Sequence, residues 1–183
     1  MPVYEELPLE EPFPRDYEVE WLVDMPNSNA LKRFEFGSGP SGPILRIKSV
    51  TSERFIATVS GEVSTLRLTT WPDPDVLFAL PSAWLINTRQ PKASFQPTGF
   101  GGHTVHYTFP IPKMDVILIG HCCGIYCYGK AGLLWGREDL FCCEDPVIDL
   151  AGDTLILLAH KHGVDPGEAP VRKTLHLMTG VAR

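Results

Sequence analysis

The sequence lacks any apolar run long enough to cross a membrane. A membrane helix needs about 20 predominantly apolar residues, whereas a run such as Val116–Gly120 ends at His121. Met1–Arg15 is acidic and rich in proline, so it has neither the basic nor the apolar region of a secretory signal. We therefore expect a cytoplasmic protein whose five cysteines are reduced thiols.

The sequence also lacks the short motifs of the common enzyme classes. Ser60 and Ser82 have no flanking glycines of the kind that form a nucleophile elbow. The glycines of residues 37–42 precede neither a helix nor a lysine that would bind phosphate. These absences favour a protein that is not an enzyme, and an unrecognised hydrolase that uses His103 or His160 is the alternative.

Positive charge is scarce relative to negative charge. The chain has 16 lysines and arginines against 22 aspartates and glutamates, which gives a formal net charge of -6. Nucleic acids and anionic membranes attract a concentrated positive field, so we expect neither as a partner. The charge instead favours a protein partner with a basic face.

Long helical stripes are absent, and short alternating segments take their place. The 17 prolines and 16 glycines are spread along the chain, as a meander of short strands requires. Tyr17–Val23 alternates apolar and polar residues, which is typical of a half-buried strand. We predict an extended acidic, proline-rich arm over residues 1–16 and a single all-β domain over residues 17–183.

One pattern recurs about every forty residues from Asp75 onwards. Each copy begins with an aspartate and an apolar run, at Asp75–Leu80, Asp115–Gly120 and Asp153–Leu158. Each continues into a second strand-like run, and these runs are Trp84–Asn87, Gly124–Tyr128 and Lys173–Leu177. The period predicts about four propeller-like units of about 40–45 residues each. A sandwich of two β-sheets is the alternative.

The last two copies resemble blades of quinoprotein-type β-propellers. The matching features are Gly124-Ile125-Tyr126, the turn Gly129–Gly132 that leads into Leu133-Leu134-Trp135, and the closing segment Leu175–Gly180. The resemblance implies blade-like antiparallel strands. It brings no cofactor and no activity to this chain.

A cluster of thiols accompanies the second copy. Alternation along a strand predicts that Cys123, Ile125 and Cys127 share one face, with Cys122, Tyr126 and Tyr128 on the other. A structural zinc site needs four converging thiolate or imidazole ligands. The candidate ligands are Cys123, Cys127, Cys142, Cys143 and His121. Buried cysteines that act as small apolar residues, and a thiol redox sensor, are the other interpretations.

Trp71 is the aromatic residue for which a contact role is predicted. It lies in Thr69-Thr70-Trp71-Pro72-Asp73-Pro74, where we expect a large ring to be hard to bury. With Asp73 and Asp75 it forms the predicted binding site. The sequence thus predicts a non-enzymatic protein that binds another macromolecule through a β surface or loops, with an immunity protein as one type that fits. A zinc or thiol sensor is the alternative function.

Overall fold

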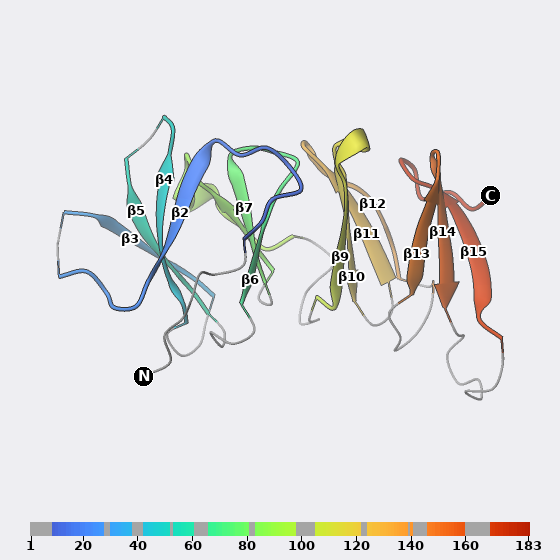
Figure 1. Cartoon of the computed structure of the whole chain (residues 1–183), viewed down its shortest axis with the longest axis horizontal. Coiled ribbons are helices and arrows are strands. Elements are labelled where there is room, and N and C mark those ends of the chain that lie inside the picture. The colour runs from blue at the N-terminus through green and yellow to red at the C-terminus, as the bar shows by residue number, and fades with distance from the viewer. Residues whose placement is uncertain are drawn as a thin grey trace. The chain divides into compact units, whose positions relative to one another are not determined.

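The chain is all-β. The computed structural model describes residues 9–27, 30–37, 42–51, 53–60, 66–80, 83–97, 105–121, 124–138, 140, 146–159 and 169–183. Within these ranges the strands form four small, mostly antiparallel sheets, none of which closes into a barrel (Figure 1). The short helices in the same ranges are single 3-10 turns, η2 (Pro91–Ala93) and η3 (Pro112–Met114). The predicted all-β class is confirmed.

The chain divides into two compact units, Met1–Pro97 and Thr98–Arg183. Each unit contains two of the four sheets, and the two sheets of a unit share one apolar core. We call them the N-terminal unit and the C-terminal unit.

The N-terminal unit contains sheets 1 and 2. Sheet 1 has the order β2-β4-β5-β3, and sheet 2 has the order β1-β6-β7-β8. Pairing is antiparallel except between β3 and β5 and between β1 and β6. The strands of sheet 1 are β2 (Tyr17–Leu22), β3 (Lys32–Phe36), β4 (Ile44–Ser49) and β5 (Phe55–Val59). Those of sheet 2 are β1 (Leu9–Glu10), β6 (Arg67–Thr70), β7 (Val76–Leu80) and β8 (Trp84–Asn87).

Part of the predicted N-terminal arm pairs with sheet 2. Leu9–Glu10 lies parallel to β6, with Leu9 opposite Leu68. The Phe13 amide then donates to Thr70 Oγ1 at 2.9 Å, and the Phe13 ring is 3% exposed. Residues 1–8 lie outside the described ranges, and the predicted bounds of the arm and of the domain stay predictions.

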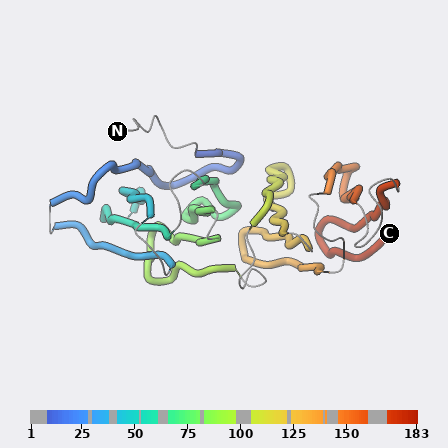
Figure 2. The backbone as a smooth tube through the Cα atoms, turned by 90° about the horizontal axis from the view of Figure 1, so that it is seen from below, coloured from blue at the N-terminus to red at the C-terminus, as the bar shows by residue number. Residues whose placement is uncertain are grey.

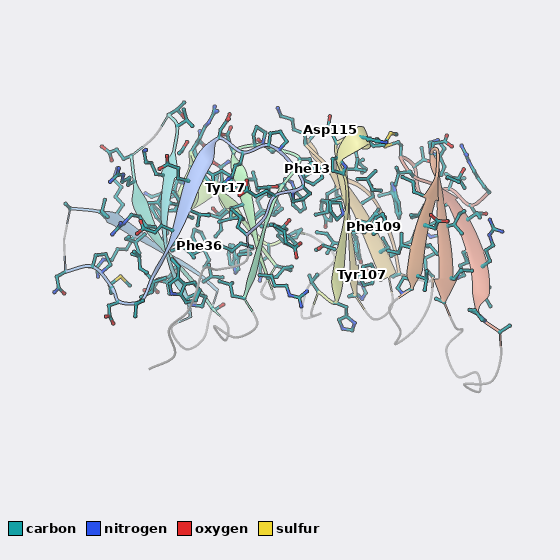
Figure 3. The ribbon with its side chains drawn as sticks, in the orientation of Figure 1. Phe13, Tyr17, Phe36, Tyr107, Phe109 and Asp115 are labelled. Atoms are coloured by element: carbon teal, nitrogen blue, oxygen red, sulfur yellow. The ribbon has the colours of Figure 1, made fainter. Side chains whose placement is uncertain are left out.

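Alternation along the strands builds the core of the N-terminal unit. In β2, Tyr17 and Val19 face the core, while Glu18 and Glu20 face outward and pair with cations of β4. The Glu18 carboxylate lies 3.1 Å from Lys48 Nζ, and that of Glu20 lies 2.8 Å from Arg46 Nη1. Figure 3 labels Tyr17 and Phe36, the aromatic core residues of the two outer strands of sheet 1. The buried core comprises Tyr17, Phe36, Leu45, Ile47, Phe55, Ala57, Val59, Leu66, Leu68, Leu77, Ala79 and Ile86.

The C-terminal unit contains sheets 3 and 4. Sheet 3 is an antiparallel meander, β12-β11-β10-β9, and sheet 4 has the order β13-β14-β15. The strands are β9 (Tyr107–Ile111), β10 (Val116–His121), β11 (Gly124–Gly129), β12 (Gly132–Arg137), β13 (Val147–Ala151), β14 (Thr154–Ala159) and β15 (Val171–His176). The buried core comprises Ile111, Val116, Leu118, Ile125, Cys127, Trp135, Leu140, Leu155, Leu157, Ala159, Leu175 and Leu177.

The forty-residue period corresponds to strands at regular spacing. β6, β9 and β13 begin at residues 67, 107 and 147, so they start forty residues apart. The three predicted apolar runs are β7, β10 and β14, each paired on both sides, and the three second runs are β8, β11 and β15. The sequence therefore located these six strands correctly.

Two of the aspartates that begin the repeated pattern close hairpins in the same way. The backbone carbonyl of Asp75 accepts from the Thr88 amide at 2.8 Å, and that of Asp153 accepts from the Leu177 amide at 2.8 Å. Each carboxylate also contacts an arginine that comes after the second strand of the same hairpin. Asp75 lies 2.6 Å from Arg89, which follows β8, and Asp153 lies 2.8 Å from Arg183, which follows β15. These aspartates thus join the two ends of a hairpin.

Close packing of a ring requires a glycine in β10. Tyr107 and Phe109 lie along β9, and Asp115 lies at the turn between η3 and β10 (Figure 3). A Cβ added to Gly120 would lie 1.9 Å from the Tyr107 ring, so only a glycine admits that ring against the strand.

Asp115 adopts a left-handed conformation with φ of 51°, which aspartate tolerates because its short polar side chain bonds locally.

We predict that Leu118→Ala destabilises the C-terminal unit alone. Leu118 is fully buried in that unit's own core, and such a truncation costs roughly 2–5 kcal/mol. Amide hydrogen exchange should show lost protection in β10, β11 and β14, with protection in β4 and β5 retained. Leu158→Ala, at a side chain that is 36% exposed in β14, is the matched control and should change little. An equal loss of amide protection in both units would contradict the prediction and indicate one cooperative domain over residues 17–183.

Candidate functional site

Trp71 is buried, so the expectation that its ring is hard to bury is wrong. The side chain is 3% exposed. Its ring centroid lies 5.2 Å from that of Phe78 in β7, at an interplanar angle of 57°. The proline-bounded segment places the ring against the neighbouring strand, and this tertiary contact has no signature in the local sequence. A contact role for Trp71 stays a prediction.

Asp73 and Asp75 organise the turn that leads into β7. Asp73 Oδ1 accepts from the Asp75 amide at 3.1 Å, and the Asp73 carbonyl accepts from the Val76 amide at 3.0 Å. Side-chain acceptors of this kind stabilise turns. Asp75 Oδ1 lies 2.6 Å from Arg89 Nε, and the Asp75 side chain is 17% exposed. Both carboxylates therefore have structural partners, and their predicted binding role stays a prediction.

The two described members of the predicted zinc set face opposite sides of sheet 3. Leu118 pairs with Cys127, and both belong to the core of the C-terminal unit. His121 pairs with Gly124 and lies on the other face, where its ring centroid is 5.6 Å from that of Tyr126. The predicted division of Ile125 and Cys127 from Tyr126 is confirmed by the same register. The structure thus does not bring His121 and Cys127 together.

The remaining candidate ligands, Cys123, Cys142 and Cys143, lie outside the described residues. Within the described ranges, no three histidine, cysteine, aspartate or glutamate side chains are grouped so that they could hold a metal ion. His103 and His160, the bases of the alternative hydrolase, also lie outside those ranges. Zinc binding and a hydrolase reaction therefore stay predictions.

Cys127 has the environment of an apolar core residue. Its side chain is fully buried, and desolvation by burial raises the pKa of the thiol from 9.0 to about 12. A reactive cysteine needs an accessible thiolate at neutral pH. Cys127 is neutral and enclosed, which fits the interpretation of this residue as a small apolar side chain.

A hollow of about 600 Å³ opens in the N-terminal unit between sheet 1 and the segment after β8. Sheet 1 contributes the start of β3 and the start of β5, and η2 and the residues before it form the opposite wall. We call this hollow the basic mouth, because four of its lining residues are cationic. The lining residues are Lys32, Phe34, Glu53, Arg54, Phe55, Arg89, Gln90, Pro91 and Lys92.

The cations of the basic mouth have different surroundings. Lys32 Nζ lies 3.1 Å from the Glu53 carboxylate, but both side chains are mostly exposed, so this pair is weak. Arg89 is held by Asp75 at 2.6 Å and approaches Asp16 at 3.6 Å. Within the described residues, no carboxylate lies within ion-pair distance of Arg54 or Lys92, which are both exposed. These two side chains are therefore the cations best placed to meet an anion from outside.

The floor of the basic mouth is aromatic. The rings of Phe34 and Phe55 meet edge to face, with centroids 5.4 Å apart and an interplanar angle of 87°. Phe55 is buried in the core, while Phe34 is partly buried and packs against that core. Phe34 therefore joins the apolar interior to the open hollow, and the site combines an apolar floor with a cationic rim.

Sequence reasoning did not find the basic mouth because its residues come from three separate segments. Lys32 and Phe34 belong to β3, Arg54 precedes β5, and Arg89 and Lys92 follow β8. No local run of the sequence is basic, and the overall charge has the opposite sign. Two weak signals existed, namely charged residues that alternate with phenylalanines in Arg33-Phe34-Glu35-Phe36 of β3, and the cluster Arg89-Gln90-Pro91-Lys92.

Comparison with known proteins does not identify the chain. No protein-family model matches it, and neither the curated proteins nor the solved structures provide a match. No helix in the described ranges has the length and apolar character that a membrane span requires. The geometry of the site is therefore the basis from which a function can be inferred.

We predict that Cys127 in the folded protein resists alkylation at neutral pH. Its thiol is buried and its pKa is about 12, so almost no thiolate reaches the reagent. Peptide mapping after iodoacetamide treatment at pH 7.5 should show the Cys127 peptide unmodified, and urea should make it reactive. Because the folded-state pKa is raised, the associated stability is fully present below pH 9 and is lost as the pH rises towards 12. Rapid alkylation of the native thiol would contradict this environment.

Proposed function

We propose that this chain is a non-enzymatic binding protein whose basic mouth engages an acidic segment of another protein. The observation that carries the proposal is the convergence of four cationic side chains around an aromatic floor, on a chain whose net charge is -6. A cationic hollow on an otherwise acidic protein is a local feature, and a local field steers a ligand of complementary charge.

The two parts of the mouth suit two parts of a ligand. The partly buried Phe34 offers contact area to one large apolar side chain, and such anchors in pockets dominate binding energy. Arg54 and Lys92 at the rim suit carboxylates beside that anchor. The volume of about 600 Å³ is within the usual range for sites that enclose one compact group. A segment with an apolar residue between acidic residues fits both parts.

The net charge of the chain suggests an acidic contact surface, whereas the proposed contact surface is basic. The overall charge favours a partner with a basic face, and the site predicted from the proline-bounded turn at Trp71 includes the acidic residues Asp73 and Asp75. Trp71 is buried, and the two aspartates serve the turn before β7, whereas the basic mouth is open to solvent. We therefore assign the contact to the mouth, and with it a partner segment that is acidic.

Selection from a random displayed peptide library tests the proposal. Peptides retained by the full chain should be enriched in aspartate and glutamate beside an apolar residue. The variant Arg54→Glu/Lys92→Glu should bind those peptides roughly tenfold or more weakly, because two attractive contacts become repulsive.

Arg67→Glu/Lys113→Glu is the matched control. It makes the same change in net charge at two exposed positions that do not line the mouth, so it should leave peptide affinity unchanged. The proposal would be overturned if the selection enriched basic peptides, or if the two double variants lost peptide affinity to the same extent.

A further inference from the structure

We infer that the side chain that anchors the acidic segment in the basic mouth is a phosphotyrosine, with its ring on the aromatic floor and its phosphate between Arg54 and Lys92. The inference rests on the proposed function and names the side chain that the site selects. A phosphotyrosine has an aromatic body and an anionic tip. The mouth has an aromatic floor and a cationic rim, so the two are complementary part by part.

Apolar surface is present on both sides of the mouth. Phe34 of β3 is partly buried on the side of sheet 1, and Pro91 of η2 is partly buried on the opposite wall. Figure 2 shows β3 in blue and the segment after β8 in yellow-green along the same side of the N-terminal unit. A planar ring suits a space between two such surfaces, because aromatic rings pack on phenylalanine in offset or edge-to-face arrangements. A tyrosine also has few rotamers to lose on binding.

The wall formed by η2 is held in place by hydrogen bonds within the chain. Asn87 Oδ1 accepts from the amides of Arg89 at 3.1 Å and Gln90 at 2.7 Å. Ser94 Oγ accepts from the Asn87 amide at 2.9 Å. A surface that is ordered before the ligand arrives loses less conformational entropy on binding. The wall is therefore preformed.

Two of the four cations that line the mouth are already compensated. Asp75 holds Arg89 at 2.6 Å. Lys32 Nζ lies 3.1 Å from the carboxylate of Glu53, which is the acidic residue among those that line the mouth. The other two cations therefore carry the positive charge that is available to a ligand.

These other two cations, Arg54 and Lys92, match one phosphate. In the described part of the chain, neither has a carboxylate within ion-pair distance. Arg54 precedes β5 and Lys92 belongs to η2, so they approach the hollow from opposite walls. A phosphotyrosine carries a charge of about -1.5 to -2 at pH 7 and three acceptor oxygens, so one group can meet both cations. A guanidinium also forms paired hydrogen bonds with phosphate.

Simpler side chains satisfy one part of the mouth. Phosphoserine has the same charge but no ring to cover Phe34, and unmodified tyrosine has the ring but no charge to meet the rim. A carboxylate brings a single negative charge. The complete site is therefore filled when a tyrosine of the partner is phosphorylated, and binding depends on that modification.

Peptides that differ at one side chain provide the test. Each is fluorescein-labelled and has the sequence Gly-Asp-Glu-X-Glu-Gly, in which X is tyrosine, phosphotyrosine, phosphoserine or sulfotyrosine. Binding to the full chain is measured by fluorescence anisotropy at neutral pH. The phosphotyrosine peptide should bind roughly tenfold or more tightly than the tyrosine and phosphoserine peptides. The sulfotyrosine peptide has one negative charge on the same ring and should bind more weakly than the phosphotyrosine peptide.

Variants of the chain locate the two contacts. Arg54→Glu/Lys92→Glu should remove the preference for phosphotyrosine over tyrosine, whereas Arg67→Glu/Lys113→Glu should retain it. Phe34→Leu keeps an apolar side chain but removes the ring, so it should weaken phosphotyrosine binding roughly threefold or more and leave phosphoserine binding unchanged. If Phe34→Leu does not fold, the first comparison still decides, because Arg54 and Lys92 are exposed.

The outcomes separate this inference from the proposed function. The inference would be overturned if the phosphotyrosine peptide bound no more tightly than the tyrosine, phosphoserine or sulfotyrosine peptide. It would also be overturned if Arg54→Glu/Lys92→Glu kept the preference for phosphotyrosine, or if none of the four peptides bound. In each of these cases, enrichment of acidic peptides in the display selection would still support the proposed function.

Discussion

The structure depends on the burial of one apolar face of each sheet against the sheet beside it in the same unit. Side chains alternate across a strand, so one strand can present an apolar face and a polar face at once. In β2 the glutamates remain outside while Tyr17 enters the core. Because burial uses one face of each sheet, charged residues remain on the opposite face and at the sheet margins. The basic mouth lies at such a place, where Phe34 continues the core towards solvent.

The parts of the fold that could be predicted from sequence are those encoded locally. The apolar runs of β7, β10 and β14 were identified because an apolar run with turns at both ends is a local pattern. Strand alternation likewise predicted that Ile125 and Cys127 share a face. Trp71 was placed wrongly because its burial depends on Phe78, and that contact cannot be recognised from the proline-bounded turn alone.

The candidate site could not be predicted for the same physical reason. The cations of the mouth come from β3, from the residue before β5 and from the segment after β8, and only sheet pairing brings them together. The parallel pairing of β3 with β5 could not be predicted from the sequence either, because β2 and β3 follow one another in sequence yet form opposite margins of sheet 1. The total charge of -6 obscured the site further, since a sum over 16 cations and 22 carboxylates does not show that four of the cations converge.

The parallel pairing of β1 with β6 constrains the order in which the chain acquires structure during its synthesis. Leu9 is opposite Leu68, so the partner of β1 is translated fifty-nine residues after it. At about 5–20 residues per second this is a delay of about 3–12 s. Sheet 1, which is complete by Val59, therefore has all of its strands available before β1 can be incorporated into sheet 2. β1 is thus among the last strands of the N-terminal unit to find its place, and a nascent chain carries that segment unpaired until β6 has left the ribosome.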